Sequence, residues 1–241
     1  MFASIPWGHH LQVITKCKDV NEALFYLAET ATHNWSRNIL VHQIESGLYQ
    51  RRGKAVTNFA ATLPQPQSDL AHELLKNPYN FDFLTLGESA KERDLEEALI
   101  RHITAFLLEL GQGFAYMGRQ YKLRLEGDEY ALDLLFYHTR LRCYVVIELK
   151  AGDFKPEYAG KLNFYLNLVD DFVKAADDKP TIGMLLCRNT GGRPRVEYAL
   201  RGIAKPIGVS EYQLTESIPD ELKGSLPSIE DIENSLNDLA S

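Results

Sequence analysis

The sequence predicts an α/β fold in which helices flank a mixed β-sheet and a small helical N-terminal region precedes it. The first observation is the order of hydrophobic patterns. Between residues 89 and 214, one strong helical pattern is followed by three strand patterns, a second helical pattern and a further strand. The second observation is the run TIGMLLC, which is apolar throughout and suits a central strand covered on both faces. Together these patterns predict a layered α/β domain.

The N-terminal part of the chain has the spacing of amphipathic helices. Apolar residues recur at Leu24, Leu27 and Ala31, and either Asn34 or Ser36 could cap a second helix that follows. The next segment, TLPQPQSDLAHELLKNPYNFDFLTL, contains three prolines and predicts a link with a short helix inside it.

We therefore expect three parts in the chain. Residues 1–85 form a helical N-terminal region with its linker, residues 86–215 form the α/β domain, and residues 216–241 form an acidic C-terminal tail. The tail carries seven acids and one lysine, and its apolar residues have helical spacing.

Local signals set the expected ends of several elements in the α/β domain. The pattern SAKERDLEEALIRHITAFLLELG predicts one helix over residues 89–110, with Ser89 as its cap and Gly111 at its end. The residues EGDE predict a tight turn between the next two strands. Pro156 predicts the first turn of a later helix. VEYALRG fits more than one structure, and IGVSEYQL predicts a last strand.

Composition narrows the classes of function. No run approaches the roughly 20 apolar residues that a membrane span needs, and the N-terminus lacks the pattern of a signal peptide. The three cysteines have no zinc spacing, so we expect a reducing, cytoplasmic setting. The net charge of −7 argues against a chain that binds nucleic acid over its whole surface, so a basic binding site has to be local.

The stretch YALDLLFYHTRLRCYVVIELK places charged residues inside two apolar strands. Glu148 and Lys150 are two residues apart on one strand, so their side chains point to the same face. A turn near residues 138–141 would put Asp133 opposite or diagonal to Glu148. We expect His138 to be a solvated residue of that turn.

Two carboxylates in this arrangement need a positive partner. A buried, unpaired carboxylate costs several kcal/mol, and a second carboxylate beside it raises that cost. A hard divalent cation held by Asp133 and Glu148 would remove both penalties. Lys150 could then orient an attacking water or balance the charge of a phosphate. The alternative reading is a structural ion pair between Asp133 and Lys150.

The chain resembles the PD-(D/E)xK nuclease superfamily, and more closely the bacterial YhcG-type proteins. The resemblance covers about residues 89–214 and rests on four segments: LEEALIRHITAFLLELGQGFAYMGRQY, DLLFYHTRLRCYVVIELKAGDFKPEYAGKLNFYLN, KPTIGMLLC and VEYALRGIAKPIGVSEYQL. WGHH and NWSRNILVHQIESGLYQR look like the end of the family's helical N-terminal region. The resemblance implies a restriction-endonuclease-like sheet, and it makes the chain look shortened at its N-terminus.

The resemblance also implies roles for particular residues. Asp133, Glu148 and Lys150 match the core site, and Glu96 is the residue that best fits the extra glutamate of the first helix, with Glu97 as its neighbour. The chain departs from the pattern at two positions. It has leucine where relatives have the proline before the aspartate, and it has Lys161 where many have glutamine.

The expected contacts to nucleic acid come from local basic and polar residues. Arg119 and Gln120 follow a glycine that allows close backbone approach, and Lys161 lies on the helix after the site. Arg188, Arg193 and Arg195 flank a Gly-Gly turn that could grip phosphates. An ordinary charged loop or exposed strand face is the alternative for each.

These observations predict a metal-dependent endonuclease that hydrolyses phosphodiester bonds. The resemblance implies Mg²⁺, with Mn²⁺ as a substitute, and DNA rather than RNA as substrate. The alternative is a non-catalytic protein that keeps the nuclease fold and binds nucleic acid or assembles a complex. The sequence is also compatible with a homo-oligomer.

Overall fold

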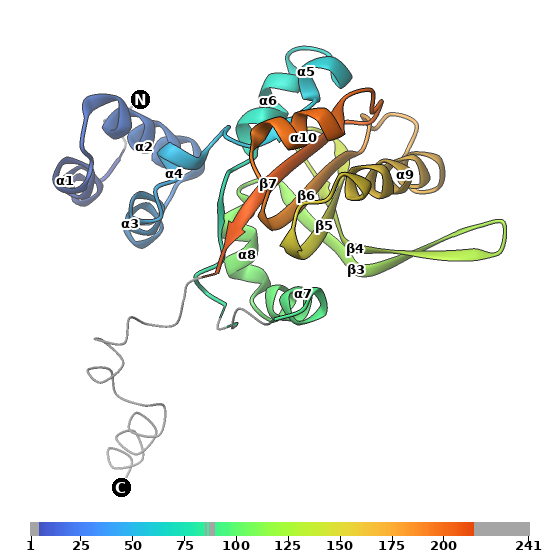
Figure 1. The fold of residues 1–241 in the computed structure, drawn as a ribbon. Helices are drawn as coiled ribbons and strands as arrows, with labels where there is room; N and C mark the ends of the chain where they lie inside the picture. The colour runs from blue at the N-terminus through green and yellow to red at the C-terminus, as the bar shows by residue number, and fades with distance from the viewer. Residues whose placement is uncertain (1–4, 85, 87–89, 215–241) are drawn as a thin grey trace, which may run out of the picture.

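A mixed β-sheet organises the larger part of the molecule, and a group of small helices lies beside it (Figure 1). The protein structure is a computed structural model that describes residues 5–84, 86 and 90–214. The strands are β1 (Val56–Thr57), β2 (Tyr79–Asn80), β3 (Phe114–Leu125), β4 (Asp128–His138), β5 (Cys143–Asp153), β6 (Ile182–Asn189) and β7 (Ile207–Gln213). The helices are α1 (Trp7–Lys16), α2 (Val20–His33), α3 (Arg37–Glu45), α4 (Leu48–Arg51), α5 (Phe59–Thr62), α6 (Gln67–Leu74), α7 (Glu92–Arg101), α8 (Ile103–Leu110), α9 (Pro156–Phe172) and α10 (Arg193–Leu200).

The sheet has the order β1-β7-β6-β5-β4-β3, and β2 pairs with β7 beside it. Strands β3, β4 and β5 are antiparallel neighbours, whereas β5, β6 and β7 run parallel. The predicted fold class, a mixed sheet flanked by helices, is therefore confirmed. Strand β6 is central, and residues 182–187 are buried, as expected for a run that is covered on both faces.

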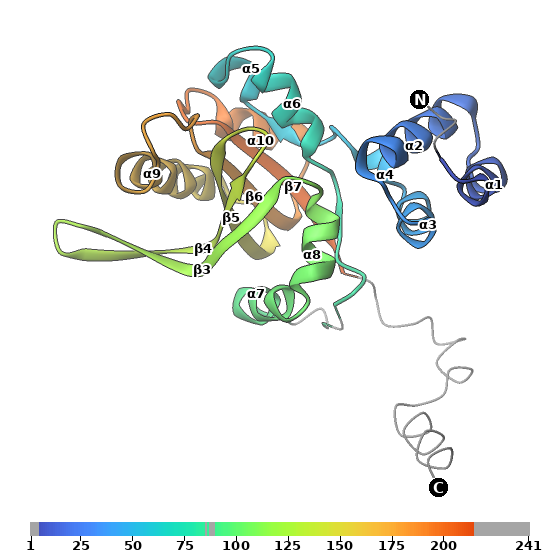
Figure 2. The same cartoon turned by 180° about the vertical axis from the view of Figure 1, so that it is seen from behind.

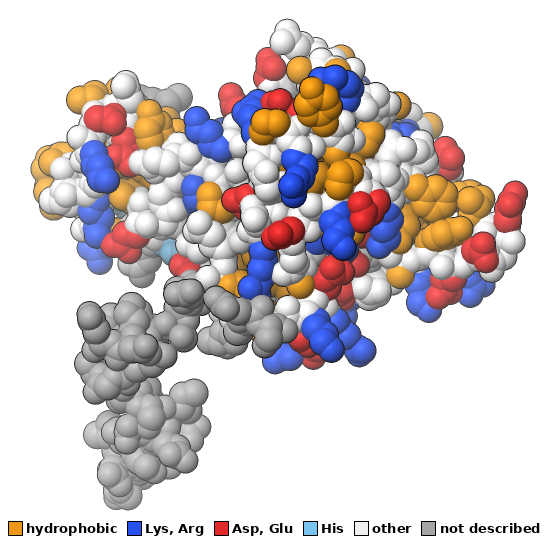
Figure 3. Space-filling view, in the orientation of Figure 1, with side chains coloured by type: hydrophobic (Ala, Val, Ile, Leu, Met, Phe, Trp, Pro, Cys, Tyr) orange, Lys and Arg blue, Asp and Glu red, His pale blue; other side chains and the backbone are white. Residues whose placement is uncertain are grey.

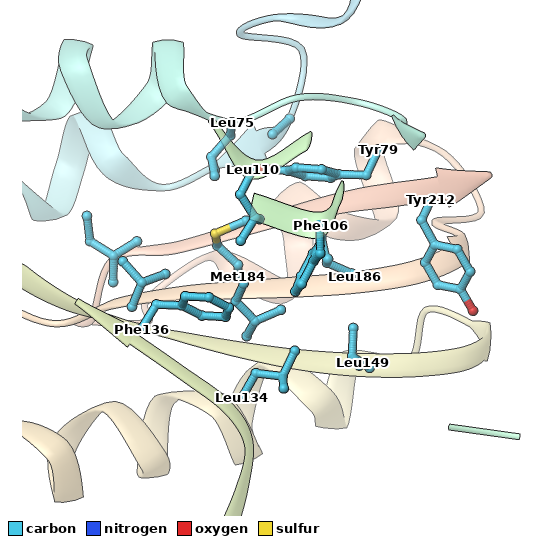
Figure 4. Close-up of a cluster of buried hydrophobic side chains, with 14 of the residues drawn as sticks. Leu75, Tyr79, Phe106, Leu110, Leu134, Phe136, Leu149, Met184, Leu186 and Tyr212 are labelled. Atoms are coloured by element: carbon cyan, nitrogen blue, oxygen red, sulfur yellow. The ribbon is translucent and has the colours of Figure 1, made fainter. Parts of the chain in front are cut away.

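Helices cover both faces of the sheet (Figures 1 and 2). On one face α7 and α8 pack over the sheet, and the aromatic and aliphatic side chains drawn in Figure 4 fill the space between the layers. On the other face α9 and α10 bury a second cluster, which includes Leu162, Leu166 and Val196. Each fully buried side chain of this size contributes about 1.5–3 kcal/mol, so both layers hold the central strands rigidly.

The single helix predicted over residues 89–110 is wrong, because the chain breaks at His102 into α7 and α8. Leu99 and Phe106 are seven residues apart, which is two helical turns, so the hydrophobic period continued across the break and gave no sign of it. Gly111 ends the second helix as expected, with φ at +107°. Ser89 lies outside the described residues, and the backbone N–H of Lys91 bonds the Asp94 carboxylate at 2.9 Å.

The proline-containing link contributes a strand to the sheet. It contains the predicted short helix, α6, and also β2, which pairs with β7, as does β1 just before the link. Asn58, which follows β1, holds this part of the chain against the sheet, since its side chain donates to the carbonyls of Ile203 and Lys205. Strands of two residues are below the length that a sequence pattern can indicate. The boundaries at residues 85 and 215 stay predictions, and the acidic tail lies outside the described residues.

The helices before the link form a small core of their own. Ser36, not Asn34, caps the helix α3 through its hydroxyl, which accepts a bond from the Ile39 N–H at 3.3 Å. Asn34 instead ends α2 in the left-handed conformation. Within residues 5–84, 86 and 90–214, every helix is too short or too polar to span a lipid bilayer.

Strands β3 and β4 form a long hairpin whose far end extends away from the sheet (Figure 1). Leu125 pairs with Asp128, so Glu126 and Gly127 form a two-residue turn. Both have positive φ, +51° and +97°, as a type I′ turn requires, and the turn predicted from EGDE is confirmed.

His138 is fully buried, so the expectation of a solvated turn residue is wrong. Its Nδ1 accepts a hydrogen bond from the Leu141 N–H at 3.1 Å, and its ring packs edge-on against Phe114. Gly113 makes room for the ring, because a Cβ there would lie 2.8 Å from it. The turn therefore closes over the imidazole.

Burial lowers the pKa of His138 from 6.5 to about 4. The unfolded chain therefore binds more protons between these values, and we expect the free energy of unfolding to fall as pH drops from about 6.5 to about 4, by up to about 3 kcal/mol. Urea unfolding across this pH range measures the slope. His138→Asn keeps an acceptor at the Nδ1 position without a titrating ring, so its slope should be flatter. Equal slopes in the two proteins would contradict the prediction.

Candidate active site

The site forms where β4 separates from β5. The two strands pair down to Leu134 and Ile147, and the same register puts Asp133 directly across from Glu148. The two positions are therefore opposite rather than diagonal. Beyond this point β4 continues only in the hairpin with β3, so the end of the β4–β5 ladder is left open for side chains.

Where β4 leaves β5, the two carboxylates accept hydrogen bonds from backbone N–H groups of the opposite strand. The Leu149 N–H donates to Asp133 Oδ2 at 2.9 Å, and the Asp133 N–H lies 3.4 Å from Glu148 Oε1. Ile147 and Leu149 point into the core under α7 and α8, so Glu148 between them points to the opposite face, toward α9. The acids are held by the sheet itself, which fixes their position.

Lys150 lies within reach of both acids. Its Nζ is 4.0 Å from Asp133 Oδ2 and 3.8 Å from Glu148 Oε2. It also donates to the carbonyl of Leu149 at 2.7 Å and lies 5.3 Å from the ring centre of Tyr158. The Glu148 and Lys150 side chains are 1% and 7% exposed, so the charges interact with little screening by solvent.

A second lysine reaches the site from α9. The Lys161 ammonium donates to Glu148 Oε2 at 3.1 Å and lies 5.0 Å from the ring centre of Tyr165. Its side chain is half-buried, in contrast to that of Lys150. Lys161 therefore neutralises part of the buried negative charge and stays partly exposed to solvent.

The pKa values of both acids are raised above those of free carboxyl groups. Burial, together with the neighbouring Asp133 carboxylate, raises the pKa of Glu148 to about 7. Burial also raises the pKa of Asp133, although the Leu149 N–H and the Lys150 ammonium oppose the change. Burial alone would lower the pKa of Lys161, but its contact with Glu148 raises it on balance. Additional positive charge would stabilise this site.

Helix α7 and the base of the β3–β4 hairpin add a further carboxylate. Gln120 belongs to β3 and lies beside Asp133 of the neighbouring strand β4. Its side chain donates to Glu96 Oε2 at 2.5 Å. Burial raises the pKa of Glu96, and the Asp133 carboxylate adds to the effect, whereas Gln120 and Arg119 oppose it. Glu97 faces away and pairs with Arg101 at 3.1 Å. The structure thus brings Glu96, and not Glu97, toward the acids.

The predicted arginines lie in different surroundings. Arg188 is the next-to-last residue of β6 and lies beside Tyr212, whose hydroxyl donates to the carbonyl of Lys150 at 3.1 Å. Arg193 and Arg195 belong to the first turn of α10, where Arg193 pairs with Glu197 at 2.7 Å. Residues 196–200 of the ambiguous VEYALRG segment belong to the same helix, and the last two residues form a turn. On the face shown in Figure 3, basic and acidic side chains are interspersed.

Sequence reasoning missed Glu92. Its Oε2 lies 3.1 Å from Lys150 Nζ, closer than the Asp133 or Glu148 carboxylates. Glu92 is the first residue of α7, one helical turn before Glu96. That spacing places both side chains on the same face of the helix, and it was the one sequence signal that could have indicated Glu92 as a site residue. An acid in a first helical turn is common for other reasons, so the signal was weak.

Two carboxylates could supply protein oxygens to a cation here. Among the described residues, no three or more Asp, Glu, His or Cys side chains gather closely enough to hold a metal ion. Asp133 and Glu148 do form a pair of oxygen donors in which both pKa values are raised, and two ammonium groups compensate their charge. This donor set suits a hard divalent cation with water in its remaining positions.

Comparison with known proteins shows the family of this chain. The YhcG PDDEXK nuclease domain matches residues 72–227, which is more than half of the chain. The chain belongs to this family. The DUF1016 N-terminal domain matches residues 1–51, in agreement with the resemblance seen in the first helices.

A curated member of the YhcG family aligns with most of the chain. The protein "Putative nuclease YhcG" of Escherichia coli (strain K12) is 36% identical over 220 residues, which is 90% of this chain and 58% of that protein. This chain therefore spans somewhat over half the length of that relative.

Comparison with solved structures gives matches of low similarity. A repair endonuclease from Pyrococcus abyssi has 19% identity and a TM-score of 0.34 over 54% of this chain and 50% of its own. A complex of EndoMS with double-stranded DNA has 16% identity and a TM-score of 0.35 over 60% of this chain and 52% of its own. At these scores neither structure adds to the assignment.

Proposed function

We propose that this YhcG-family chain is a metal-dependent nuclease that hydrolyses phosphodiester bonds in DNA. The observation that carries the proposal is the position of the Lys150 ammonium, within 4.0 Å of both the Asp133 and the Glu148 carboxylates at the end of a paired strand. Phosphodiester hydrolysis adds negative charge to the phosphate oxygens and the leaving oxygen, so a catalyst needs fixed positive charge at this point.

Asp133 and Glu148 are the residues that would hold the cation. Their raised pKa values support this role, because a cation would stabilise both ionised forms at once. When bound, Mg²⁺ or Mn²⁺ would supply Lewis-acid stabilisation of the charge that develops on the phosphate. Asp133 is further held by the Leu149 N–H, which keeps one of its oxygens in place.

Lys150 would steady the attacking water or the phosphate itself. Its ammonium is held by the Leu149 carbonyl and lies against the Tyr158 ring, so little side-chain freedom remains to be lost when substrate binds. Lys161 has a partly exposed ammonium beside the acids and suits a contact to a neighbouring phosphate. Glu96, Gln120 and Arg119 flank the other side and would position the strand or the water.

The runner-up is a non-catalytic protein that binds nucleic acid or assembles a complex on the same fold. The net charge of −7 favours it, because a strong nucleic-acid surface is usually basic. The compensated set of Asp133, Glu148 and Lys150 favours the enzyme, since a binding module has no need for buried, mutually repelling acids.

Divalent ions are expected to raise the melting temperature, because they bind only the folded site. At a hundredfold excess over Kd the gain is about 2.7 kcal/mol. Asp133→Asn should respond less to Mg²⁺ and Mn²⁺. Asp177→Asn removes an exposed acid that pairs with Arg142 and should respond like wild type. Differential scanning fluorimetry across ion concentrations makes the comparison, and identical responses of wild type and Asp133→Asn would place the metal elsewhere.

Cleavage assays then separate the two functions. Linear, branched and single-stranded DNA, with matched RNA, are incubated with and without Mg²⁺ or Mn²⁺. The nuclease proposal expects cleavage that requires the ion and disappears in Asp133→Asn. Binding of these substrates without cleavage, under either ion, would favour the non-catalytic protein.

A further inference from the structure

We propose that Glu92 holds Lys150 in the free protein by occupying the position that a substrate phosphate takes, so that binding requires the phosphate to displace this carboxylate. The inference rests on the proposed role of Lys150 and adds a control element to the same site. Glu92 would be a positioning residue that competes with substrate.

The distances single out Glu92 among the acids around Lys150. The Lys150 Nζ lies 3.1 Å from Glu92 Oε2, but 3.8 Å from Glu148 Oε2 and 4.0 Å from Asp133 Oδ2. Only the first of these is within ordinary hydrogen-bond range. Asp133 and Glu148, the proposed metal-binding acids, are thus the more distant partners of Lys150. Its shortest ion pair is with Glu92 of helix α7.

The burial of the two partners is unequal. The Lys150 side chain is 7% exposed, whereas that of Glu92 is 49% exposed. Glu92 therefore covers the lysine from the solvent side, which is the side from which a phosphate has to approach. An ion pair with a half-exposed partner contributes little to stability, so Glu92 can be displaced.

The chemistry of the carboxylate matches that of the group it would imitate. A carboxylate and a phosphodiester each present negatively charged oxygens that accept charge-assisted hydrogen bonds from an ammonium. Lysine acts as a compact point charge that can exchange one such partner for another without a change of geometry. Its other hydrogen bond, to the Leu149 carbonyl at 2.7 Å, need not change.

Duplex binding without metal tests the competition. Fluorescence anisotropy with a short labelled DNA duplex in EDTA compares wild type with Glu92→Gln, and we expect binding to tighten about two- to fivefold. Glu92→Asp keeps the charge but withdraws the carboxylate, so it should also tighten binding. In the Lys150→Ala background, Glu92→Gln should give no gain, because the two side chains act through one contact.

The matched control is Glu97→Gln. Glu97 lies on the same helix, its side chain is 48% exposed, and it pairs with Arg101 instead of Lys150. Its replacement removes the same charge at a similar exposure and should leave binding near the wild-type value. An equal gain in Glu97→Gln would mean that the lost charge alone explains the effect, and would overturn the proposal.

A second measurement makes the inference independent of DNA. Inorganic phosphate, titrated in a thermal melt, should stabilise Glu92→Gln more than wild type or Glu97→Gln, and the extra shift should vanish with Lys150→Ala. If phosphate gives this extra shift but no variant binds the duplex, the competition by Glu92 is supported and the proposal of a DNA nuclease is contradicted. Duplex binding with no effect of Glu92→Gln in either assay would overturn only the competition. A loss of the Mg²⁺-induced shift in Glu92→Gln would make Glu92 part of the metal site and would also overturn it.

Discussion

Lys150→Ala is expected to reduce DNA cleavage severely while leaving most of the duplex affinity intact. In the proposed site Lys150 is one cation beside the reacting phosphate, and loss of a single preorganised group that stabilises developing charge lowers kcat by about 10²–10³. Duplex affinity would instead come from several phosphate contacts, each of which adds about −0.9 to the slope of log K against log salt.

A variant in which Arg188, Arg193 and Arg195 are all replaced provides the comparison for duplex binding. If these arginines bind phosphates, their removal should flatten the salt dependence far more than Lys150→Ala does. Lys54→Ala, which replaces an exposed lysine between α4 and β1, should change neither cleavage nor binding. Lys150→Gln repeats the test with a side chain of similar size, in case alanine destabilises the two acids.

Two results would contradict this assignment. Loss of duplex binding in Lys150→Ala, with an unchanged salt response in the triple variant, would mean that the binding groove lies elsewhere. Arg119 and Lys161, which flank the acids directly, would then be the next residues to replace. Unaltered cleavage in Lys150→Ala would remove this residue from the reaction.

Glu109→Ala is expected to lower the free energy of unfolding by about 3–5 kcal/mol, because it leaves two buried cations without their partner. Glu109 is buried in α8, and its Oε1 accepts from Arg51 Nη1 at 2.5 Å and from the Asn80 N–H at 2.8 Å. Lys76 donates to the Glu109 carbonyl and lies 3.5 Å from the carboxylate. Burial lowers the pKa of Lys76 to about 8.

Urea unfolding monitored by circular dichroism measures the loss. Glu45→Ala serves as the matched control, because Glu45 forms an exposed pair with Lys16 that should be worth less than about 1 kcal/mol. Arg51 comes from α4, in the helical N-terminal region, so the same contact joins that region to the sheet domain. A loss no larger than that of Glu45→Ala would mean that this buried cluster contributes little to stability.

The sequence by itself determined what depends on neighbours along the chain. Glu148 and Lys150 share a face because side chains alternate along a strand, and Gly127 marks the hairpin turn because glycine adopts positive φ without steric cost. Pro156 begins α9 for a similar local reason, since its fixed φ suits a first helical turn. These features needed no knowledge of the partner elements.

Only the tertiary structure decided what depends on residues far apart in the sequence. Asp133 lies opposite Glu148 because β4 leaves β5 at that pair, and a strand pattern does not contain the register of its neighbour. Glu92 meets Lys150 because α7 packs against the end of β5, 58 residues away in the chain. His138 is buried because a turn closes over it beside Gly113. Packing between distant segments sets each of these contacts, and the local pattern around each residue is compatible with other arrangements.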